Sequence, residues 1–273
     1  MSEPAPAPDG PHISLDRVHM AFGERPVFRG LSCAFARGRI TVVLGGSGSG
    51  KSTILRIIAG LVRPQAGRVE VGGEDIRALP DSKLFRVRSS IGMLFQGGAL
   101  LDSLTVFDNL AFPLRERTRR TEDEIAAAVR ARLESVGLSG VDHLLPGQLS
   151  GGMLRRTALA RALMMDPEIL LCDEPFSGLD PISVKRIEVL LSRLNRRLGI
   201  TVVIVSHHIA STMRLADQVL LLLPGRAITG TPSELRASPD AEIAGFFDED
   251  LDESLEPDTT GGQVAPTPRG PGA

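Results

Sequence analysis

Short apolar runs alternate with helical patterns along most of the chain. Continuous or alternating apolar stretches predict strands at residues 13–18, 27–35, 40–44, 68–71, 91–95, 168–172, 201–205 and 217–223. Apolar positions at helical spacing predict helices at residues 53–61, 105–114 (ending near Pro113), 121–136, 149–164, 182–198 and 232–237. This alternation indicates an α/β fold. The first two strands, joined by a turn at residues 23–26, predict an antiparallel β element ahead of the core.

A glycine-rich run connects the strand at 40–44 to the helix at 53–61. It consists of Gly45, Gly46, Ser47, Gly48, Ser49, Gly50, Lys51 and Ser52. In the pattern G-x-x-x-x-G-K-[ST], backbone N–H groups and the lysine surround nucleotide phosphates, and the hydroxyl ligates Mg²⁺. The alternative, a flexible linker, needs neither the Lys-Ser pair nor the flanking strand and helix. The run therefore predicts a site for a nucleoside triphosphate with Mg²⁺.

Polar residues follow three other predicted strands. Gln96 follows 91–95, Asp173 and Glu174 follow 168–172, and His207 lies just after 201–205. Such positions are where α/β sheets place ligand-contacting groups. Adjacent carboxylates cost desolvation free energy unless a cation or substrate uses them, so we interpret Asp173 as facing a metal and Glu174 as activating water. For His207 the alternatives are a structural role and contact with a phosphate.

Two further features are candidates for nucleotide contact. Phe22 sits in the loop of the first β element, where it either stacks on an adenine ring or packs within the turn. Ser150, Gly151 and Gly152 open a predicted helix and leave N–H groups suited to an anion. On that helix, Arg155 is expected on the polar side with its neighbouring arginines.

Composition narrows the class of protein. With 273 residues and 42% hydrophobic content, the chain can form one large α/β core with a smaller subdomain. A net charge of -2 removes the bulk electrostatic argument for nucleic-acid binding. We expect no bilayer span, since no apolar run reaches about eighteen residues, and no secretory signal. Cys33 and Cys172 lie in apolar contexts, which indicates reduced thiols and a cytosolic setting.

The ends of the chain differ from its middle. Residues 1–11 are rich in Pro and Ala and are expected to be disordered. Residues 12–247 are expected to form the ordered domain, with a helical subdomain at about 97–165. From residue 248 the chain is acidic and then rich in Gly, Pro and Thr up to 273. We interpret this tail as disordered; the alternative is contact with a neighbouring protomer or a small regulatory subunit.

Together these motifs resemble the ATP-binding subunit of ABC transporters over nearly the whole ordered length. Residues 45–52 resemble the Walker A loop, Gln96 the Q-loop, 149–153 the signature loop, 169–174 the Walker B strand with its glutamate, 177–180 the D-loop and His207 the switch histidine. The resemblance implies a P-loop NTPase core of the RecA type, with an N-terminal antiparallel β subdomain and a helical subdomain. It also implies hydrolysis of ATP with Mg²⁺.

The resemblance assigns roles residue by residue. Catalytic roles fall to Glu174, His207 and Gln96, and metal contacts to Ser52, Gln96 and Asp173. Nucleotide contacts fall to Phe22 as the A-loop aromatic, the run from Gly45 to Ser52, Thr53, Asp180, and the signature residues Ser150, Gly151 and Gly152. The signature residues complete the site of a second protomer, so the resemblance implies a head-to-tail homodimer. His208 stands where Asp is usual and leaves the His207 assignment intact.

A finer resemblance is to the ATPase of the Mla/MCE lipid transporters. It is carried by residues 93–100, 106–116 and 149–156, and by Met153, where most of the superfamily has Gln or Glu. It implies phospholipid trafficking between the inner and outer membranes, with the chain at the cytoplasmic face of the inner membrane. The implied partners are integral permease subunits, an MCE-domain lipid-binding protein and a small regulatory subunit.

Other functions remain as alternatives. Within transporters, the runner-up is the ATPase of an importer for amino acids or another small solute. A soluble ABC ATPase acting on nucleic acid or ribosomes usually carries a long coiled-coil insertion or a second cassette, and this sequence has neither. A P-loop kinase or GTPase would not need the signature loop.

Overall fold

The computed structural model describes residues 10–253, with side chains up to residue 247. Contacts divide the chain between Ser233 and Glu234 into two units. The first unit contains every predicted site residue. The division falls inside the ordered domain predicted at 12–247, and the extent of that domain stays a prediction.

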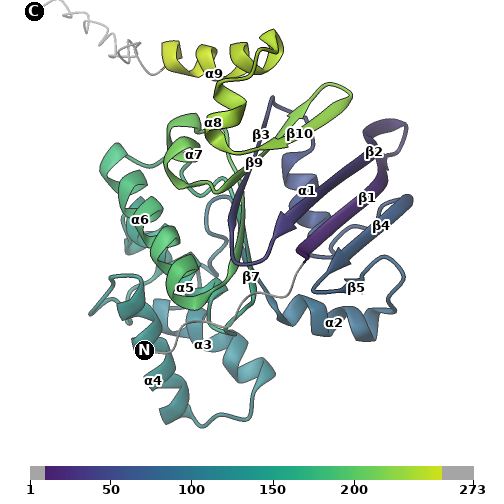
Figure 1. Cartoon of the computed structure of the whole chain (residues 1–273). Helices are drawn as coiled ribbons and strands as arrows, with labels where there is room; N and C mark the ends of the chain where they lie inside the picture. Colours follow the sequence, from purple (N-terminus) through teal and green to yellow (C-terminus); the bar gives the residue numbers. More distant parts are fainter. Residues whose placement is uncertain (1–9, 254–273) are drawn as a thin grey trace, which may run out of the picture. The chain divides into compact units, whose positions relative to one another are not determined.

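A six-stranded sheet forms the core of the first unit, in the order β10-β9-β3-β8-β7-β6 (Figure 1). Its strands are β3 (Ile40–Gly45), β6 (Ile91–Leu94), β7 (Ile169–Asp173), β8 (Thr201–Val205), β9 (Gln218–Leu223) and β10 (Arg226–Gly230). Only β10 pairs antiparallel, in a hairpin with β9. Strands β3, β7 and β8 are buried at every position, which explains their continuous apolar runs. Because these strands are parallel, their carboxyl ends meet at one edge.

A second, four-stranded sheet has the order β2-β1-β4-β5. It consists of β1 (Pro11–Phe22), β2 (Arg25–Ala36), β4 (Ala66–Val71) and β5 (Glu74–Asp75), and all neighbours are antiparallel. The predicted antiparallel β element is therefore confirmed. Its first two strands are longer than predicted, because backbone pairing continues from Pro11 with Ala36 to Phe22 with Arg25 at the hairpin end.

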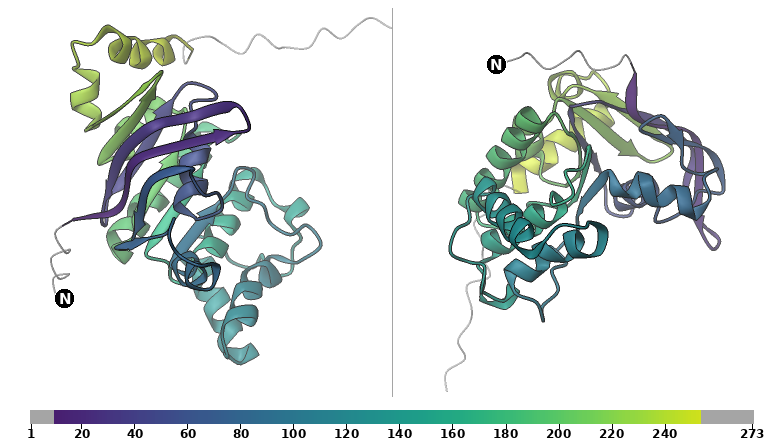
Figure 2. Two further views of the ribbon diagram at one scale, coloured as in Figure 1. Left: turned by 90° about the vertical axis from the view of Figure 1, so that its right-hand side faces the viewer. Right: turned by 90° about the horizontal axis from the view of Figure 1, so that it is seen from below.

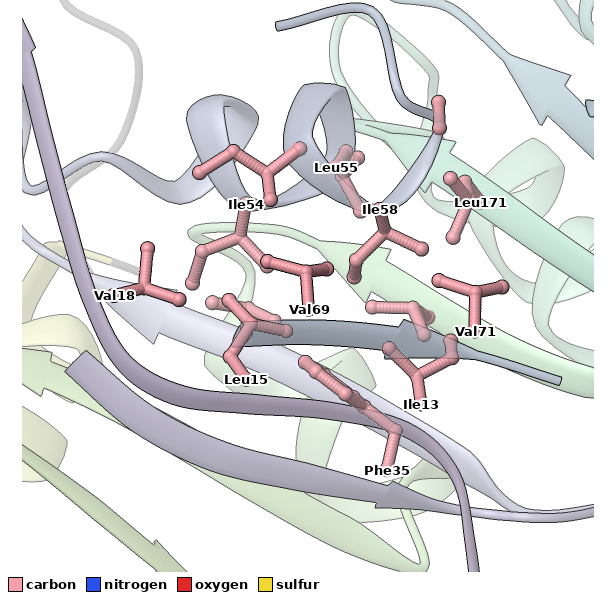
Figure 3. Close-up of a cluster of buried hydrophobic side chains, with 14 of the residues drawn as sticks. Ile13, Leu15, Val18, Phe35, Ile54, Leu55, Ile58, Val69, Val71 and Leu171 are labelled. Atoms are coloured by element: carbon pink, nitrogen blue, oxygen red, sulfur yellow. The ribbon is translucent and has the colours of Figure 1, made fainter. Parts of the chain in front are cut away.

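Helix α1 (Lys51–Ile58) lies between the two sheets. Its side chains Ile54, Leu55 and Ile58 are fully buried in one cluster with Val69 of the smaller sheet and Leu171 of the larger sheet (Figure 3). The first turn of α1 directly follows β3 through the glycine-rich loop. Packing on both faces of α1 therefore fixes the position of that loop.

The region predicted as a helical subdomain, about 97–165, contains α3 (Val106–Arg117), α4 (Glu122–Ser135), a short 3-10 turn (Pro146–Gln148) and α5 (Gly151–Ala162). Its helices pack on one another, and α5 contacts β6 at the edge of the larger sheet (Figure 2). A capping box of Thr121 and Glu124 begins α4. The predicted end of α3 near Pro113 is wrong: the helix continues to Arg117, because the proline removes a single backbone hydrogen bond while Leu114 extends the buried face.

The remaining helices are α2 (Asp81–Ser89), α6 (Pro181–Leu198), α7 (Ile209–Leu215), α8 (Pro232–Arg236) and α9 (Ala241–Glu253). Neither α2 nor α7 was predicted. In the second unit, α9 includes residues 248–253 of the predicted disordered tail, where Ile243, Phe247 and Leu251 recur at helical spacing. The rest of both predicted disordered ends, residues 1–9 and 254–273, lies outside the described residues. Within residues 10–253, no helix is both long and apolar enough to span a membrane.

Candidate active site

The glycine-rich loop has glycine where side chains would collide. A Cβ on Gly45 would lie 2.6 Å from the carbonyl oxygen of Leu222, and a Cβ on Gly50 would lie 2.6 Å from Cγ1 of Val27. Both residues also have positive φ, at 148° and 96°. The glycines at the two ends of G-x-x-x-x-G are thus required by their positive φ and by neighbouring atoms that leave no room for a Cβ. Between them, the loop closes with a hydrogen bond from Ser49 N to Gly46 O at 3.2 Å.

The start of α1 is suited to an anion. Its N-cap, Gly50, provides no side-chain acceptor, and the first turn contains no acidic residue, so backbone N–H groups are available there. Lys51 donates from Nζ to the carbonyl oxygens of Gly45 and Gly46 at 2.6 and 3.0 Å. Burial lowers the pKa of Lys51, while the nearby carboxylates of Glu174 and Asp173 oppose that shift. The loop therefore presents N–H groups and an ammonium to one place, and Thr53, in the first turn of α1, is buried.

Ser52 and Asp173 meet beside the loop. Ser52 Oγ donates to Oδ1 of Asp173 at 2.9 Å, across 121 positions in sequence. Asp173 is the last residue of β7 and is 9% exposed. A hydroxyl and a carboxylate are oxygen ligands of the kind that Mg²⁺ takes together with phosphate oxygens. Two of the three side chains predicted to contact the metal, Ser52 and Asp173, are therefore adjacent.

Glu174 and His207 face each other beyond the ends of β7 and β8. Oε2 of Glu174 lies 2.9 Å from Nδ1 of His207. The same oxygen is shielded from solvent and receives no well-aligned hydrogen bond within residues 10–247. Glu174 also has φ of 49°, a left-handed conformation that a non-glycine residue keeps only where its surroundings impose it. A buried acceptor with unused capacity in an imposed orientation is suited to holding a reacting water.

The hairpin between β1 and β2 lies beside the phosphate loop. Nη2 of Arg25 is 3.4 Å from where a Cβ of Gly48 would stand. Phe22 pairs with Arg25 across the hairpin, and its side chain is 47% exposed. An exposed aromatic at the edge of a phosphate site can stack on a base. This position is compatible with the predicted adenine contact, which stays a prediction.

Arg155 of α5 joins two predicted motifs, a role that the sequence did not indicate. It donates to Phe95 O, next to Gln96, at 3.4 Å and to Ser177 O, in the predicted D-loop, at 3.1 Å. The prediction that Arg155 lies on the polar side of its helix is wrong, since the residue is 6% exposed. Its guanidinium is buried because backbone carbonyls accept from it. This role depends on two irregular loops that lie close to α5, and no pattern in the sequence indicates that proximity.

The remaining predicted residues cap helices or lie apart. Ser150 caps α5 by accepting from Met153 N at 3.3 Å, and the helix begins at Gly151, while a Cβ on Gly152 would lie 2.9 Å from Ser183 Oγ of α6. Asp180 caps α6 by accepting from Ile182 N and Ser183 N. A hydrogen bond with the Ser183 side chain lowers the pKa of Asp180, and these backbone hydrogen bonds act in the same direction. Within residues 10–247, no hydrogen bond or ion pair joins Gln96 or the signature residues to the phosphate loop. Their nucleotide roles stay predictions.

The family described as ABC transporter matches residues 28–177, a span that holds the phosphate loop, Gln96, the signature loop and both carboxylates. The chain is also 41% identical over 237 residues to the intermembrane phospholipid transport system ATP-binding protein MlaF of Escherichia coli strain K12, covering 86% of this chain and 88% of that protein. The chain belongs to the ABC transporter family. It is 37% identical to the probable ribonucleotide transport ATP-binding protein mkl of Mycobacterium tuberculosis strain H37Rv, covering 88% of this chain and 67% of that protein.

A solved member of the ABC transporter family supports the fold and the chemistry. It is an ATP-binding cassette in a dimeric, post-hydrolysis state bound to ADP and Pi, 31% identical with a TM-score of 0.74, covering 81% of this chain and 98% of that chain. The predicted fold is therefore confirmed, and the chain is an ATPase that binds ATP. ABC cassettes dimerise and work with membrane permease subunits.

Proposed function

We propose that this chain is the ATPase of a transporter that moves phospholipid between the inner and outer membranes. The observation that carries the proposal is its 41% identity to MlaF along 86% of the chain. Met153 in the signature loop supports it, because that residue belongs to the resemblance with the lipid transporters. The chain acts at the cytoplasmic face of the inner membrane, with permease subunits, an MCE-domain lipid-binding protein and a small regulatory subunit. A small-solute transporter is the alternative that the name of mkl favours.

In the proposed mechanism, the chain holds the phosphates and activates water. Lys51 and the N–H groups at the start of α1 bind the phosphates, and their positive charge stabilises the charge that develops as the terminal phosphoryl group transfers. Glu174 orients and polarises the attacking water through its buried Oε2. His207 lies close enough to Glu174 to contact the same phosphoryl group. Phe22 stacks on the adenine.

Mg²⁺ is the proposed cofactor, held by Ser52 and Asp173 with Gln96 as a further contact. The hydrogen bond of 2.9 Å between Ser52 and Asp173 supports a shared ion for these two residues. When bound, Mg²⁺ neutralises phosphate charge. Gln96 follows β6 and is exposed, so its contribution requires the loop after Leu94 to approach the nucleotide.

A second copy of the chain completes the proposed site. Ser150, Gly151 and Gly152 are at the start of α5, where the first turn contains no acidic residue that would repel a phosphate. Asp180 lies at the start of α6 and is the D-loop residue at the same dimer contact. The dimeric state of the solved cassette supports this arrangement.

Lipid analysis of the purified transporter tests the substrate. We would express the chain with the genes adjacent to its own, purify the assembly in a mild detergent and measure bound phospholipid by mass spectrometry. The proposal predicts co-purified permease and MCE-domain proteins, with phospholipid that is retained in excess over a detergent-matched control membrane protein. An assembly that contains a permease but no MCE-domain protein, and that binds an amino acid or nucleotide rather than phospholipid, would overturn the lipid function while leaving the ATPase intact.

A further inference from the structure

His208 forms the N-cap of α7 directly after the proposed catalytic His207. Its Nδ1 accepts from the backbone N–H of Ser211 at 3.3 Å, and the Ser211 hydroxyl lies 2.9 Å from the same nitrogen. Capping positions usually carry Asp, Asn, Ser or Thr, whose short side chains reach the free N–H groups of the first turn. Here an imidazole nitrogen satisfies that N–H group.

Buried polar groups hold the backbone of His208 as well. Its N–H donates to Ser206 Oγ at 3.0 Å, and its carbonyl oxygen accepts from Thr212 Oγ1 at 3.0 Å. Ser206 and Ser211 are fully buried and Thr212 is 1% exposed. Hydrogen bonds at buried sites are costly to leave unmade, so this arrangement resists displacement. His208 is therefore fixed at its backbone and at its side chain.

The ring of His208 also contacts the segment that follows Glu174. Its centroid lies 6.1 Å from that of Phe176, with the planes tilted by 57°. Phe176 is 4% exposed and lies two residues after Glu174. The adjacent histidine, His207, reaches Glu174 itself at 2.9 Å, although its own side chain is 66% exposed. Two consecutive histidines thus contact the same segment, one at the carboxylate and one at the aromatic ring.

We propose that His208 is a positioning residue for ATP hydrolysis, which holds His207 against Glu174 by capping α7 and by packing on Phe176. The exposed side chain of His207 has little packing of its own, so its orientation depends on the backbone that His208 fixes. This inference rests on the proposed roles of Glu174 and His207. It does not require contact between His208 and ATP.

The test compares two substitutions of His208 with a matched loss of a helix cap elsewhere. His208→Ala removes the acceptor and the ring, whereas His208→Asn restores an acceptor oxygen at the capping position. Thr121→Ala removes the cap of α4, where Thr121 accepts from Glu124 N, outside the proposed site. Steady-state ATP hydrolysis is measured for the full-length chain assembled in its transporter, and thermal unfolding is measured in parallel.

We expect His208→Ala to lower kcat roughly tenfold, equivalent to about 1.4 kcal/mol in the activation barrier, with KM for ATP changed by less than about twofold. His208→Asn is expected to recover kcat to within roughly threefold of the wild type, because it restores the cap. Thr121→Ala is expected to lose comparable thermal stability without losing kcat. If His208 had only a structural role, kcat would instead fall in both His208→Ala and Thr121→Ala, in proportion to the thermal stability that each variant loses.

Three results would overturn the proposal. These are an unchanged kcat in His208→Ala, an equal loss of kcat in Thr121→Ala, and a failure of His208→Asn to recover activity although it folds. Glu174→Gln serves as a separate arm that tests the proposed roles. If Glu174→Gln keeps its activity, the proposed chemistry fails; if it is inactive and His208→Ala is fully active, only the positioning role fails.

Discussion

Replacing Glu174 with glutamine isolates the charge of the proposed water-activating group. Glutamine keeps the shape of the side chain but exchanges a carboxylate oxygen for an amide group. In the wild type, Oε2 is buried and 2.9 Å from Nδ1 of His207, with no well-aligned hydrogen bond from residues 10–247. That oxygen therefore has spare capacity to accept a hydrogen bond from a water molecule. Because glutamine has nearly the same size as glutamate, the substitution removes the negative charge that polarises the water without opening a cavity.

The size of the effect follows from the chemistry of the step. Base assistance by a positioned carboxylate contributes about 10²–10⁴-fold, or roughly 3–5 kcal/mol of barrier, so kcat is expected to fall by at least a hundredfold. ATP affinity is expected to stay within about threefold. Glu174 raises the pKa of Lys51 against the effect of burial, but Asp173 acts in the same direction and is retained. Glu174→Gln should therefore lose ATP turnover while it keeps ATP binding.

Phosphate release at saturating ATP measures kcat, and calorimetric titration with ATP measures affinity. Glu168→Gln is the matched control, because Glu168 precedes β7 at the opposite end of the strand and is 64% exposed. It should hydrolyse ATP like the wild type. If Glu174→Gln retains more than about a tenth of wild-type turnover, Glu174 does not activate the water and the interpretation of its buried oxygen is refuted.

Other substitutions test the fold around the site. Gly50→Ala places a Cβ 2.6 Å from Val27 at φ of 96°, so it is expected to cost about 1–3 kcal/mol and to abolish ATP binding, measured by thermal unfolding with and without ATP. Arg155→Ala leaves the carbonyl of Ser177 without its donor and is expected to destabilise the chain by about 2–4 kcal/mol in urea unfolding. Burial lowers the pKa of His12 below 6.5, so the unfolded chain binds the proton more readily than the folded chain. Stability is therefore expected to fall as pH drops below about 6.5. His12→Gln should reduce this pH dependence of stability, measured by thermal unfolding between about pH 5 and 8.

Two of these substitutions, Gly50→Ala and Arg155→Ala, have a matched control within the same structure. Gly46→Ala lies in the same loop as Gly50, but its Cβ would meet nothing within 4 Å, so folding should be preserved. Arg130→Ala removes an exposed arginine and should cost less than about 0.5 kcal/mol. Equal destabilisation in either control and its test variant would contradict the stated causes. For His12, the argument fails if wild type and His12→Gln lose stability identically on acidification.

Local pattern was enough to predict the elements that carry the phosphate loop. Strand β3 is buried at every position, and α1 carries apolar residues at helical spacing after a loop in which Gly45 and Gly50 are required sterically. The positions of Asp173 and His207 followed from the rule that parallel strands end at one edge. That rule predicted that these side chains lie close together, but it did not predict how each is oriented. The left-handed backbone conformation of Glu174 was therefore visible only in the structure.

The missed elements lacked a local signal. In α2 only Leu84 and Val87 are buried, too few to mark an amphipathic helix. Helix α7 is short and capped by a histidine, whereas the usual capping residues would have marked its start. Arg155 was misplaced because its partners are backbone carbonyls of two distant loops.

The burial of α1 between two sheets has a consequence for dynamics. Its amide protons from Ile54 onward can exchange with solvent only if one sheet separates from the helix, which disrupts the cluster that joins both sheets. Hydrogen exchange in α1 should therefore be among the slowest in residues 10–253, with or without ATP. Nucleotide entry and release must then come from motion of the hairpin at Phe22 and of neighbouring loops, while the helix behind the phosphates stays in place.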